Sequence, residues 1–297
     1  MKITLIMATV GRTDEVARFL AYLEKQTYHD FELIIVDSNE DKRLVPLINK
    51  YGSVFSIIYQ RFGKSGVSRA RNYGLKFASG DIIGFPDDDS WYPQDLLAEA
   101  AEWFNRHPEA GGLIGRVLDE RGNIVVGKFN KTAQVLDRYG AWGCASTNTM
   151  FWRRNVLPAP PVFKEDLGVG TNTLWGCAED TQLLIKIIDA GELVWYQPSL
   201  IVYHPDPYAN TRQVLHRRGY LYGCGVGYVM GTNGYPSWFY YYYLGRCLGA
   251  LILAVFKLDR KRADHHWQTL KGRRFGWKTA GQMKPDENIN SYFLGRP

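Results

Sequence analysis

The sequence has few cysteines and lacks the short motifs of two common nucleotide-binding classes. Its 4 cysteines lie far apart and form no CxxC pair, which argues against both a zinc module and a disulfide scaffold. No GxGxxG pattern follows the first apolar run, and the loop Gly63–Gly66 does not have the Walker spacing. Dinucleotide-binding and P-loop proteins are therefore disfavoured. Cysteines spaced in this way fit a reducing cytoplasm.

Export signals and long uninterrupted apolar runs are also lacking. The stretch Met1–Ala8 has one basic residue and an apolar run too short for a signal peptide, so we expect a first strand and a cytoplasmic location. The aromatic and aliphatic stretch Trp238–Phe256 is interrupted by Arg246, and a charge near the bilayer centre costs about 2.5 to 3.5 kcal/mol. A helix lying on the membrane surface and a helix packed on the rest of the fold both fit this stretch better than a span.

Positive charge is concentrated in the last third of the chain. The 297 residues carry a net charge of +6. Residues 206–297 contain fourteen Lys and Arg against five Asp and Glu, a net charge of +9, whereas residues 1–205 carry −3. Because the basic segment alternates with apolar and aromatic runs, an anionic membrane surface is the better partner and RNA the weaker one. We expect peripheral attachment at the inner face of the membrane and no nucleic acid.

Apolar runs alternate with amphipathic segments in the first part of the chain. The runs lie at residues 3–8, 31–36, 55–59 and 81–85. This alternation predicts an α/β fold with a mostly parallel sheet and flanking helices. Three polar clusters follow such runs, at Thr9–Arg12, Asp37–Asn39 and Asp87–Asp89. Because ligands bind at the carboxyl ends of parallel strands, we expect these clusters to converge on one edge.

The second half of the chain has a mixed pattern. The expected elements are a hairpin at 111–126, a strand at 147–152, a glycine- and proline-rich loop at 158–176, a helix from Glu179 to Gly191, and two short strands at 193–196 and 201–203. We place the domain boundary after this last strand. Residues 1–205 then form the α/β domain, and residues 206–297 form a helical C-terminal extension.

The most informative motif is the run of three aspartates Asp87–Asp89. Three adjacent carboxylates repel one another, and a hard divalent cation or its phosphate ligands would neutralise them. A solvated acidic turn is the alternative. However, the apolar and rigid residues Trp91–Pro93 come next instead of further polar ones. We therefore interpret the run as a cation site.

Four segments of this chain stand in the order found in a known enzyme family. They are Gln26–Asp37, with QTY and a strand ending in aspartate; Ser68–Gly74, with ARNxG; the aspartate run, in place of a DxD motif; and Gly176–Asp180, which ends in Glu-Asp. Together they resemble the family 2 glycosyltransferases over roughly residues 1–205. The resemblance implies a Rossmann-like GT-A fold. It also implies an inverting transfer from a nucleotide-diphosphate sugar.

The resemblance also assigns a donor site. Asp37 would contact the nucleotide base, although Ser38–Asn39 stands where the family often has a second aspartate. Arg71 would contact the diphosphate, because two parallel guanidinium donors match two phosphate oxygens. Thr9, at the end of the first strand, is counted with these donor-binding residues.

The aspartate run would hold the metal and part of the donor. By resemblance Asp89 binds Mn²⁺ or Mg²⁺, and Asp88 contacts the ribose or the sugar. Asp87 would face the ribose, the sugar or the water shell of the metal. His204 follows a short apolar strand, where many members of the family place a metal-binding histidine.

Asp180 is the expected general base. An inverting transferase needs a carboxylate that removes the proton of the acceptor hydroxyl. Its neighbour Glu179 is the alternative base, and acidic residues at a helix start are also stabilising in themselves. Trp91 and Trp175 could stack on sugar faces or belong to the core.

The complete hypothesis is a metal-dependent transferase that moves a single sugar, most simply from a UDP-sugar, to a glycan or polyprenyl-linked acceptor in polysaccharide or glycolipid synthesis. The QxxRW motif of processive synthases is lacking, since Val214–Arg217 after Gln213 contains no tryptophan. A nucleotidyltransferase on a similar sheet and a non-catalytic membrane-associated assembly protein stay as alternatives. The latter predicts no loss of function when Asp89 or Asp180 becomes asparagine.

Overall fold

The computed structural model describes residues 1–124 and 131–282, which form two compact units. The first unit comprises Met1–Phe163 and Asp180–Asp206. The second comprises Lys164–Glu179 together with the chain from Pro207 onward. The segment Lys164–Glu179, which we had placed in the α/β domain, therefore groups with the C-terminal helices.

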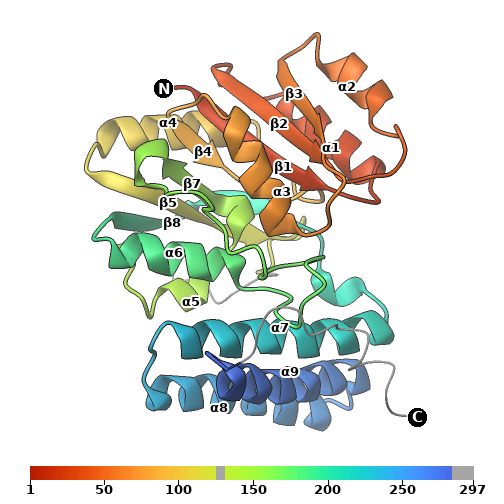
Figure 1. Ribbon diagram of the computed structural model, residues 1–297, viewed down its shortest axis with the longest axis vertical. Helices are drawn as coiled ribbons and strands as arrows, with labels where there is room; N and C mark the ends of the chain where they lie inside the picture. Colours follow the sequence, from red (N-terminus) through yellow and green to blue (C-terminus); the bar gives the residue numbers. More distant parts are fainter. Residues whose placement is uncertain (125–130, 283–297) are drawn as a thin grey trace. The chain divides into compact units, whose positions relative to one another are not determined.

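The first unit is an α/β structure, as the alternation of apolar runs predicted (Figure 1). Its helices and strands are β1 (Ile3–Thr9), α1 (Asp14–Leu23), β2 (Phe31–Asp37), α2 (Val45–Tyr51), β3 (Ser56–Arg61), α3 (Val67–Gly74), β4 (Ile82–Gly84), α4 (Leu96–Arg106), β5 (Ala110–Leu118), β6 (Gln134–Val135), α5 (Ala141–Cys144), β7 (Met150–Arg153), α6 (Glu179–Asp189) and β8 (Leu193–Tyr203).

The strands form one mostly parallel sheet in the order β3-β2-β1-β4-β7-β5-β8-β6. Strands β1 to β4 are mutually parallel, whereas β7 is antiparallel to both β4 and β5. The carboxyl ends of β1, β2 and β4 consequently lie at one edge. This is the edge at which the three polar clusters were expected to meet.

Because successive side chains of a strand point to opposite faces of the sheet, the core lies on both faces. Leu5 of β1 and Leu33 of β2 pack in one cluster with Phe19 of α1 and Phe104 of α4, all fully buried. The other face contacts α3, where the chain requires glycine at position 74. A Cβ at Gly74 would lie 2.5 Å from the Ile6 side chain. Helix α3 therefore packs close to the sheet and holds its arginines in place.

Several predicted elements in the second half differ in the structure. The turn after β5 forms, with the Asp119 N–H donating to the Asn123 carbonyl, and in the part of the chain that the structure describes the returning segment makes one bridge, between Leu118 and Ile124. Residues 125–126 of the predicted hairpin lie outside the described residues. Residues 147–149 form a 3₁₀ turn, so the next strand starts at Met150. The two predicted strands at 193–196 and 201–203 are one strand, β8, whose pairing with β5 shifts register near Ile114.

The second unit contains the helices α7 (Arg212–Thr232), α8 (Ser237–Phe256) and α9 (Arg260–Thr279). Glycines bring α7 and α9 into close contact. A Cβ at Gly223 would lie 2.5 Å from the Thr269 carbonyl oxygen, and a Cβ at Gly276 would lie 2.1 Å from the Cys224 carbonyl oxygen. These distances leave no room for a side chain. The backbones themselves therefore form much of the contact between α7 and α9.

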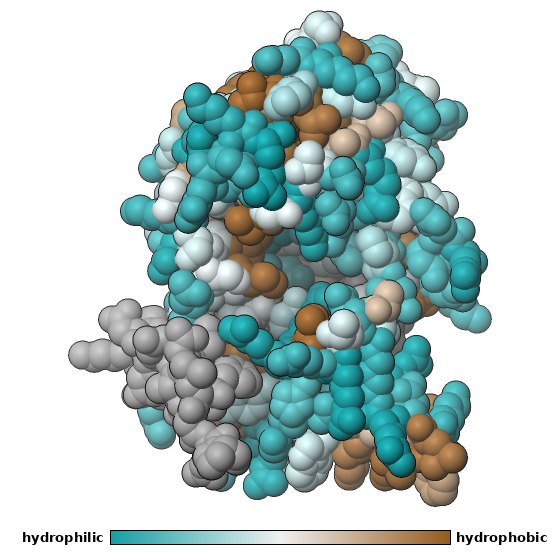
Figure 2. Space-filling view, turned by 90° about the vertical axis from the view of Figure 1, so that its right-hand side faces the viewer, coloured by the Kyte–Doolittle hydropathy of each residue, from teal (hydrophilic) through white to brown (hydrophobic). Residues whose placement is uncertain are grey.

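Helix α8 packs on α9 with one face and exposes the other. Phe239, Tyr243, Cys247 and Ala254 form its buried stripe. The large apolar side chains that it exposes are Trp238, Tyr241, Tyr242, Leu248, Ile252, Leu253, Val255 and Phe256. Apolar surface of this kind appears in brown at the lower edge of Figure 2. Among residues 1–124 and 131–282, α8 is the one helix long and apolar enough to cross a membrane, with 28% of its most apolar window buried.

Candidate active site

The aspartate run lies just beyond β4, beside the end of β1. A parallel bridge between Ala8 and Asp87 continues the pairing of the two strands. Thr9 then donates its hydroxyl hydrogen to Asp88 Oδ2 over 2.7 Å. The sheet therefore brings together two of the polar clusters that follow separate apolar runs in the sequence.

His204 reaches the same place from the end of β8. Trp91 and Tyr203 form an antiparallel bridge with two hydrogen bonds, each 3.0 Å between N and O. This bridge sets His204 Nε2 3.2 Å from Asp89 Oδ1. His204 Nδ1 lies 2.6 Å from the Pro205 carbonyl oxygen, which can only accept, so Nδ1 carries a hydrogen. Nε2 is thus the nitrogen that faces the carboxylates.

Three side chains in this cluster fit a divalent cation. One donor atom from each of Asp87, Asp89 and His204 lies within 4.8 Å of the others. Two carboxylate oxygens and one imidazole nitrogen suit Mn²⁺, and Mg²⁺ accepts the same oxygens. The contact between Nδ1 and a backbone carbonyl is the kind of support that orients ligating histidines.

Three arginines surround the carboxylates. Arg71 Nη2 lies 2.9 Å from Asp87 Oδ1, and its side chain is only 2% exposed. Arg12 Nη1 lies 2.5 Å from Asp88 Oδ1 and 2.7 Å from Asp89 Oδ2. Arg18 donates to the Asp89 carbonyl oxygen over 2.7 Å. Sequence reasoning identified Arg71 but missed Arg12 and Arg18, because neither belongs to a recognised motif.

The pKa values of the three aspartates differ because their surroundings differ. Burial raises the pKa of Asp87 despite the opposing charge of Arg71. Burial also raises the pKa of Asp88 to about 6, against the effects of Arg12 and of the Thr9 hydrogen bond. Burial acts in the same direction on Asp89, but the hydrogen bond and charge of His204 outweigh it and lower the Asp89 pKa to about 2. Asp89 is therefore the carboxylate that stays ionised most firmly.

Asp37 lies at the end of β2 and is fully buried. Its Oδ1 accepts hydrogen bonds from the backbone and side-chain nitrogens of Asn39, and its Oδ2 accepts from the Tyr59 hydroxyl. Burial, followed by this bond, raises the pKa of Tyr59 to about 12. Asn39 Oδ1 accepts from the Gly11 N–H over 2.7 Å. Asn39, in the Ser38–Asn39 pair that follows Asp37, thus connects the end of β2 to the loop after β1.

Asp180 and Glu179 are placed by other contacts. Asp180 begins the part of α6 that belongs to the first unit, and its Oδ1 accepts from the Thr181 backbone N–H over 2.6 Å. It also lies near Cys144, because burial and then the charge of Asp180 raise the pKa of that thiol to about 12. Glu179 is buried and belongs to the second unit.

The two tryptophans considered for sugar stacking are both core residues. Trp91 is 4% exposed, and its ring lies against the Tyr203 ring with centroids 5.9 Å apart. The Arg18 guanidinium covers the Trp91 ring at 4.2 Å. Trp175 is 2% exposed and stacks on Tyr228 within the second unit. Their faces are already in contact with the protein, so the stacking hypothesis for them is wrong.

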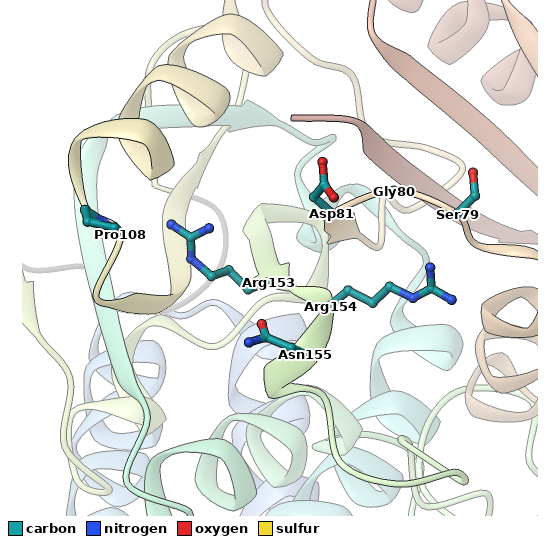
Figure 3. A pocket seen from close by; sticks show the side chains of 7 residues that line it. All are labelled: Ser79, Gly80, Asp81, Pro108, Arg153, Arg154 and Asn155. Carbon is teal, nitrogen blue, oxygen red and sulfur yellow. The ribbon is translucent and has the colours of Figure 1, made fainter.

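A hollow at the opposite edge of the sheet has a structural role. It is lined by Ser79, Gly80, Asp81, Pro108, Arg153, Arg154 and Asn155 (Figure 3). Asp81 precedes β4, and Arg153 ends the antiparallel strand β7. Arg153 donates to the carbonyl oxygens of Ala110 and Phe104, and Asp81 accepts from the Lys2 N–H. Arg153 and Asp81 therefore hold the strand ends together.

The sequence profile of the family "Glycosyl transferase family 2" matches residues 4–157. This is more than half of the 297 residues. The chain belongs to glycosyl transferase family 2. The match includes the aspartate run, Asp37 and Arg71, and it ends before Asp180 and His204. The matched family is one of glycosyltransferases, as the sequence motifs predicted, and this match favours that class over the nucleotidyltransferase alternative.

Curated relatives in the family match part of the chain. WfgD of Escherichia coli, a UDP-Glc:alpha-D-GlcNAc-diphosphoundecaprenol beta-1,3-glucosyltransferase, is 26% identical over 170 residues, covering 55% of this chain and 66% of WfgD. The poly(ribitol-phosphate) beta-N-acetylglucosaminyltransferase TarS of Staphylococcus aureus is 25% identical over 111 residues, covering 36% of this chain and 19% of TarS. The matches thus span less than two thirds of either relative.

Solved structures of glycosyltransferases have the same GT-A fold. The mannosyltransferase PcManGT from Pyrobaculum calidifontis, in complex with GDP-Man and Mn²⁺, superposes with a TM-score of 0.65 at 16% identity over 93% of this chain and 86% of its own. Residues 1–349 of S. aureus TarS, in complex with UDP-GlcNAc, superpose with a TM-score of 0.59 at 15% identity over 95% of this chain and 93% of that one. The predicted fold is confirmed.

Proposed function

We propose that this protein transfers a single sugar from a nucleotide-diphosphate sugar, with a UDP-sugar as the first candidate, to a hydroxyl of a glycan or lipid-linked acceptor. The observation that carries the proposal is the cluster of Asp87, Asp89 and His204 at the carboxyl edge of the sheet. A donor diphosphate needs positive charge, and carboxylates can supply it only by holding a cation. TarS with UDP-GlcNAc and PcManGT with GDP-Man and Mn²⁺ support this choice of donor class.

Asp89 and His204 would hold Mn²⁺ or Mg²⁺, with Asp87 as the third donor. When bound, the ion would offset the negative charge that develops on the leaving diphosphate. Arg71 would add a fixed charge at the same site, because its buried guanidinium is anchored on Asp87. Asp88, held by Thr9, would contact the ribose or the sugar. Asp37 would contact the base.

Asp180 would serve as the general base in an inverting reaction. Its carboxylate would remove the proton of the acceptor hydroxyl as that oxygen attacks the anomeric carbon opposite the diphosphate. The hydrogen bond from the Thr181 backbone N–H to Oδ1 would orient the carboxylate for this role. Glu179 is the alternative base.

A membrane surface would supply the acceptor. The exposed face of α8 consists of apolar and aromatic side chains and glycine, and the basic run Lys257–Arg262 follows directly. Aromatic residues favour the membrane interface, and lysine and arginine favour anionic headgroups. We therefore place the protein at the inner face of the cell membrane as a peripheral enzyme. The diphosphoundecaprenol acceptor in the name of WfgD fits such a location.

The donor and the metal can be tested together. Purified protein is incubated with a panel of UDP-, GDP- and TDP-sugars, and slow donor hydrolysis is measured with Mn²⁺ and then with excess chelator. We expect hydrolysis of at least one donor, most readily a UDP-sugar, that stops on chelation. A panel in which no donor gives a metal-dependent signal would refute the proposal.

The base assignment needs an acceptor and two matched variants. With an acceptor found by screening short glycans and polyprenyl-diphosphate sugars, Asp180→Asn should abolish transfer while donor binding is retained. Glu179→Gln removes the neighbouring charge with the same small change in shape. Full transfer by Asp180→Asn together with loss in Glu179→Gln would move the base role to Glu179.

A further inference from the structure

Arg12 occupies a position that is unusual for a loop arginine. Its single nitrogen Nη1 lies 2.5 Å from Asp88 Oδ1 and 2.7 Å from Asp89 Oδ2. It thus bridges two carboxylates in the way that a bound cation would. One of the bridged groups, Asp89, belongs to the set of three side chains that fits a divalent ion, and the other does not.

The contact with Arg12 occupies Asp89 Oδ2, the carboxylate oxygen that does not face His204. Asp89 Oδ1 faces His204 Nε2 at 3.2 Å, and Oδ2 faces Arg12. A metal ion that shares this carboxylate would stand next to a guanidinium charge, and like charges at such a distance repel one another strongly in a partly buried site. Arg12 and a divalent cation are therefore competitors for Asp89.

Arg12 is also better able than Arg71 to move away from the carboxylate that it contacts. Its side chain is 37% exposed, whereas that of Arg71 is 2% exposed. The residue before it, Gly11, has a φ of +76°, a conformation that glycine adopts readily and that permits the loop to turn. Val10, the next residue toward β1, is 64% exposed. The Gly11 N–H is held by Asn39 Oδ1 over 2.7 Å, so the movement that we consider is that of the exposed Arg12 side chain and not of the loop backbone.

We propose that Arg12 is the counter-cation of Asp88 and Asp89 in the metal-free enzyme and that it moves onto the donor diphosphate when the divalent ion binds. The inference rests on the proposed function. It gives Arg12, a residue outside the recognised motifs, one role before the metal binds and another role afterwards. In the free enzyme Arg12 neutralises one buried and one partly buried carboxylate, and in the loaded enzyme its planar donors bind phosphate oxygens.

The proposal predicts effects of opposite sign on two ligands. Removal of Arg12 takes away the competitor for the metal, so Mn²⁺ should bind more tightly in the absence of nucleotide. Removal also takes away a diphosphate contact, so nucleotide should bind less tightly when Mn²⁺ is saturating. A residue that only shaped the loop would weaken both ligands when it is lost.

The experiment measures binding by calorimetry on the full chain, with Mn²⁺ alone and then with UDP, or GDP in parallel, at saturating Mn²⁺. We expect Arg12→Gln to increase Mn²⁺ affinity about fivefold to tenfold and to decrease nucleotide affinity by about tenfold. Arg18→Gln is the matched control, because Arg18 carries the same charge but contacts the backbone oxygen of Asp89 and the Trp91 ring instead of the carboxylates that Arg12 bridges. It should change Mn²⁺ affinity by less than about twofold.

The outcomes separate this inference from the function on which it rests. Unchanged or weaker Mn²⁺ binding in Arg12→Gln, with Mn²⁺ binding lost in Asp89→Asn, overturns the role of Arg12 and leaves the metal site intact. Equal gains in Arg12→Gln and Arg18→Gln also overturn it, because they show a general charge effect. If wild-type protein does not bind Mn²⁺, the proposed metal site and this inference both fail. Arg12→Lys keeps the charge and should give a Mn²⁺ affinity between those of the wild type and Arg12→Gln, because the gain in the glutamine variant reflects the removal of a competing charge.

Discussion

The sheet unit and the C-terminal helical unit are packed by different types of residue. In the sheet unit, large side chains such as Phe19, Phe104 and Trp152 fill the core and are fully buried. In the helical unit, α7 and α9 meet through glycines, and many of the large apolar side chains of α8 are exposed. In the first unit, apolar side chains thus stabilise the fold by forming its core. In the second unit, many apolar side chains are exposed and can contact another surface.

The same contrast separates the functional roles of the two units. The first unit collects its charged groups at one sheet edge, where Asp89 and His204 are held by strand ends. The second unit has its charge spread along helices and adjacent to an apolar face. A site with fixed distances is suited to chemistry, and an extended surface is suited to attachment. The variants below test this division, from the largest expected effect to the smallest.

Loss of the Asp89 charge should have the largest effect. Asp89→Asn keeps the size of the side chain but removes the carboxylate that faces His204 and Arg12. We expect sugar transfer to fall by about a thousandfold, since an essential metal ligand is lost. Circular dichroism should show an unchanged fold. Asp41→Asn breaks an exposed ion pair with Arg43 and should leave transfer unchanged; substantial activity in Asp89→Asn would disprove the site.

A methyl group between α7 and α9 should destabilise the helical unit. In Gly276→Ala the new Cβ meets the Cys224 carbonyl oxygen at 2.1 Å, so the helices must separate, at about 2 to 3 kcal/mol. Hydrogen exchange of α7 and α9 should accelerate while that of the sheet stays the same.

Gly249→Ala provides the control for that prediction. A Cβ at Gly249 of α8 meets nothing within 4 Å among the described residues. Alanine there should stabilise α8 by about 0.5 to 1 kcal/mol through its better helix propensity. Equal destabilisation by the two substitutions would contradict the close packing of α7 on α9.

Charges on the exposed face of α8 should release the protein from membranes. In the double variant Leu253→Glu/Phe256→Glu, binding to vesicles of phosphatidylglycerol and phosphatidylethanolamine should weaken at least about thirtyfold in a sedimentation assay, because apolar burial and headgroup attraction are both lost. Val54→Glu alters an exposed apolar residue of the sheet unit and should bind like wild type. Undiminished binding of the double variant would assign attachment to another surface.

The stability of the sheet unit should depend on pH through Glu32. Burial would raise its pKa, but hydrogen bonds from Lys2, Thr4 and Ser79 lower the pKa from 4.5 to about 2. A depressed folded-state pKa adds stability above the unfolded value, and this stability is lost as pH falls from about 4.5 toward 2. Urea unfolding at pH 5 and pH 3 should reveal a loss of about 2 kcal/mol. Glu32→Gln should show a smaller difference between the two pH values.

The alternation of apolar runs and amphipathic segments predicted the parallel half of the sheet well, because each of its strands corresponds to one apolar run in the sequence. Residues 31–36, for example, form a run that is apolar except for Glu32, and β2 occupies Phe31–Asp37. The antiparallel insertion of β7 between β4 and β5 could not be predicted in this way, since it depends on pairings distant in sequence. Helices after residue 206 were predicted and are present as α7, α8 and α9. The glycine contacts were not predicted, because helix periodicity was sought in apolar side chains.

The motif residues of the site were predicted and its supporting residues were not. Thr9, Arg71, Asp87–Asp89 and His204 meet as the sequence suggested. Arg12 was missed because its contact with Asp88 exists only when β1 lies beside β4, and that order is a property of the sheet. Asp37 was expected to face a ligand, and its partner Tyr59 on β3 could not be foreseen without the same strand order.

The bridge between Trp91 and Tyr203 has a consequence for how the protein matures. The two segments that it joins lie far apart in the sequence, and Tyr203 is close to the last residue of the first unit, so the loop that the bridge closes is one of the last to form as the chain is synthesised. Until then the aspartates are present without the imidazole. Under the proposed function, metal affinity would therefore depend on completion of the sheet, and a growing chain would bind the ion fully only once β8 is in place.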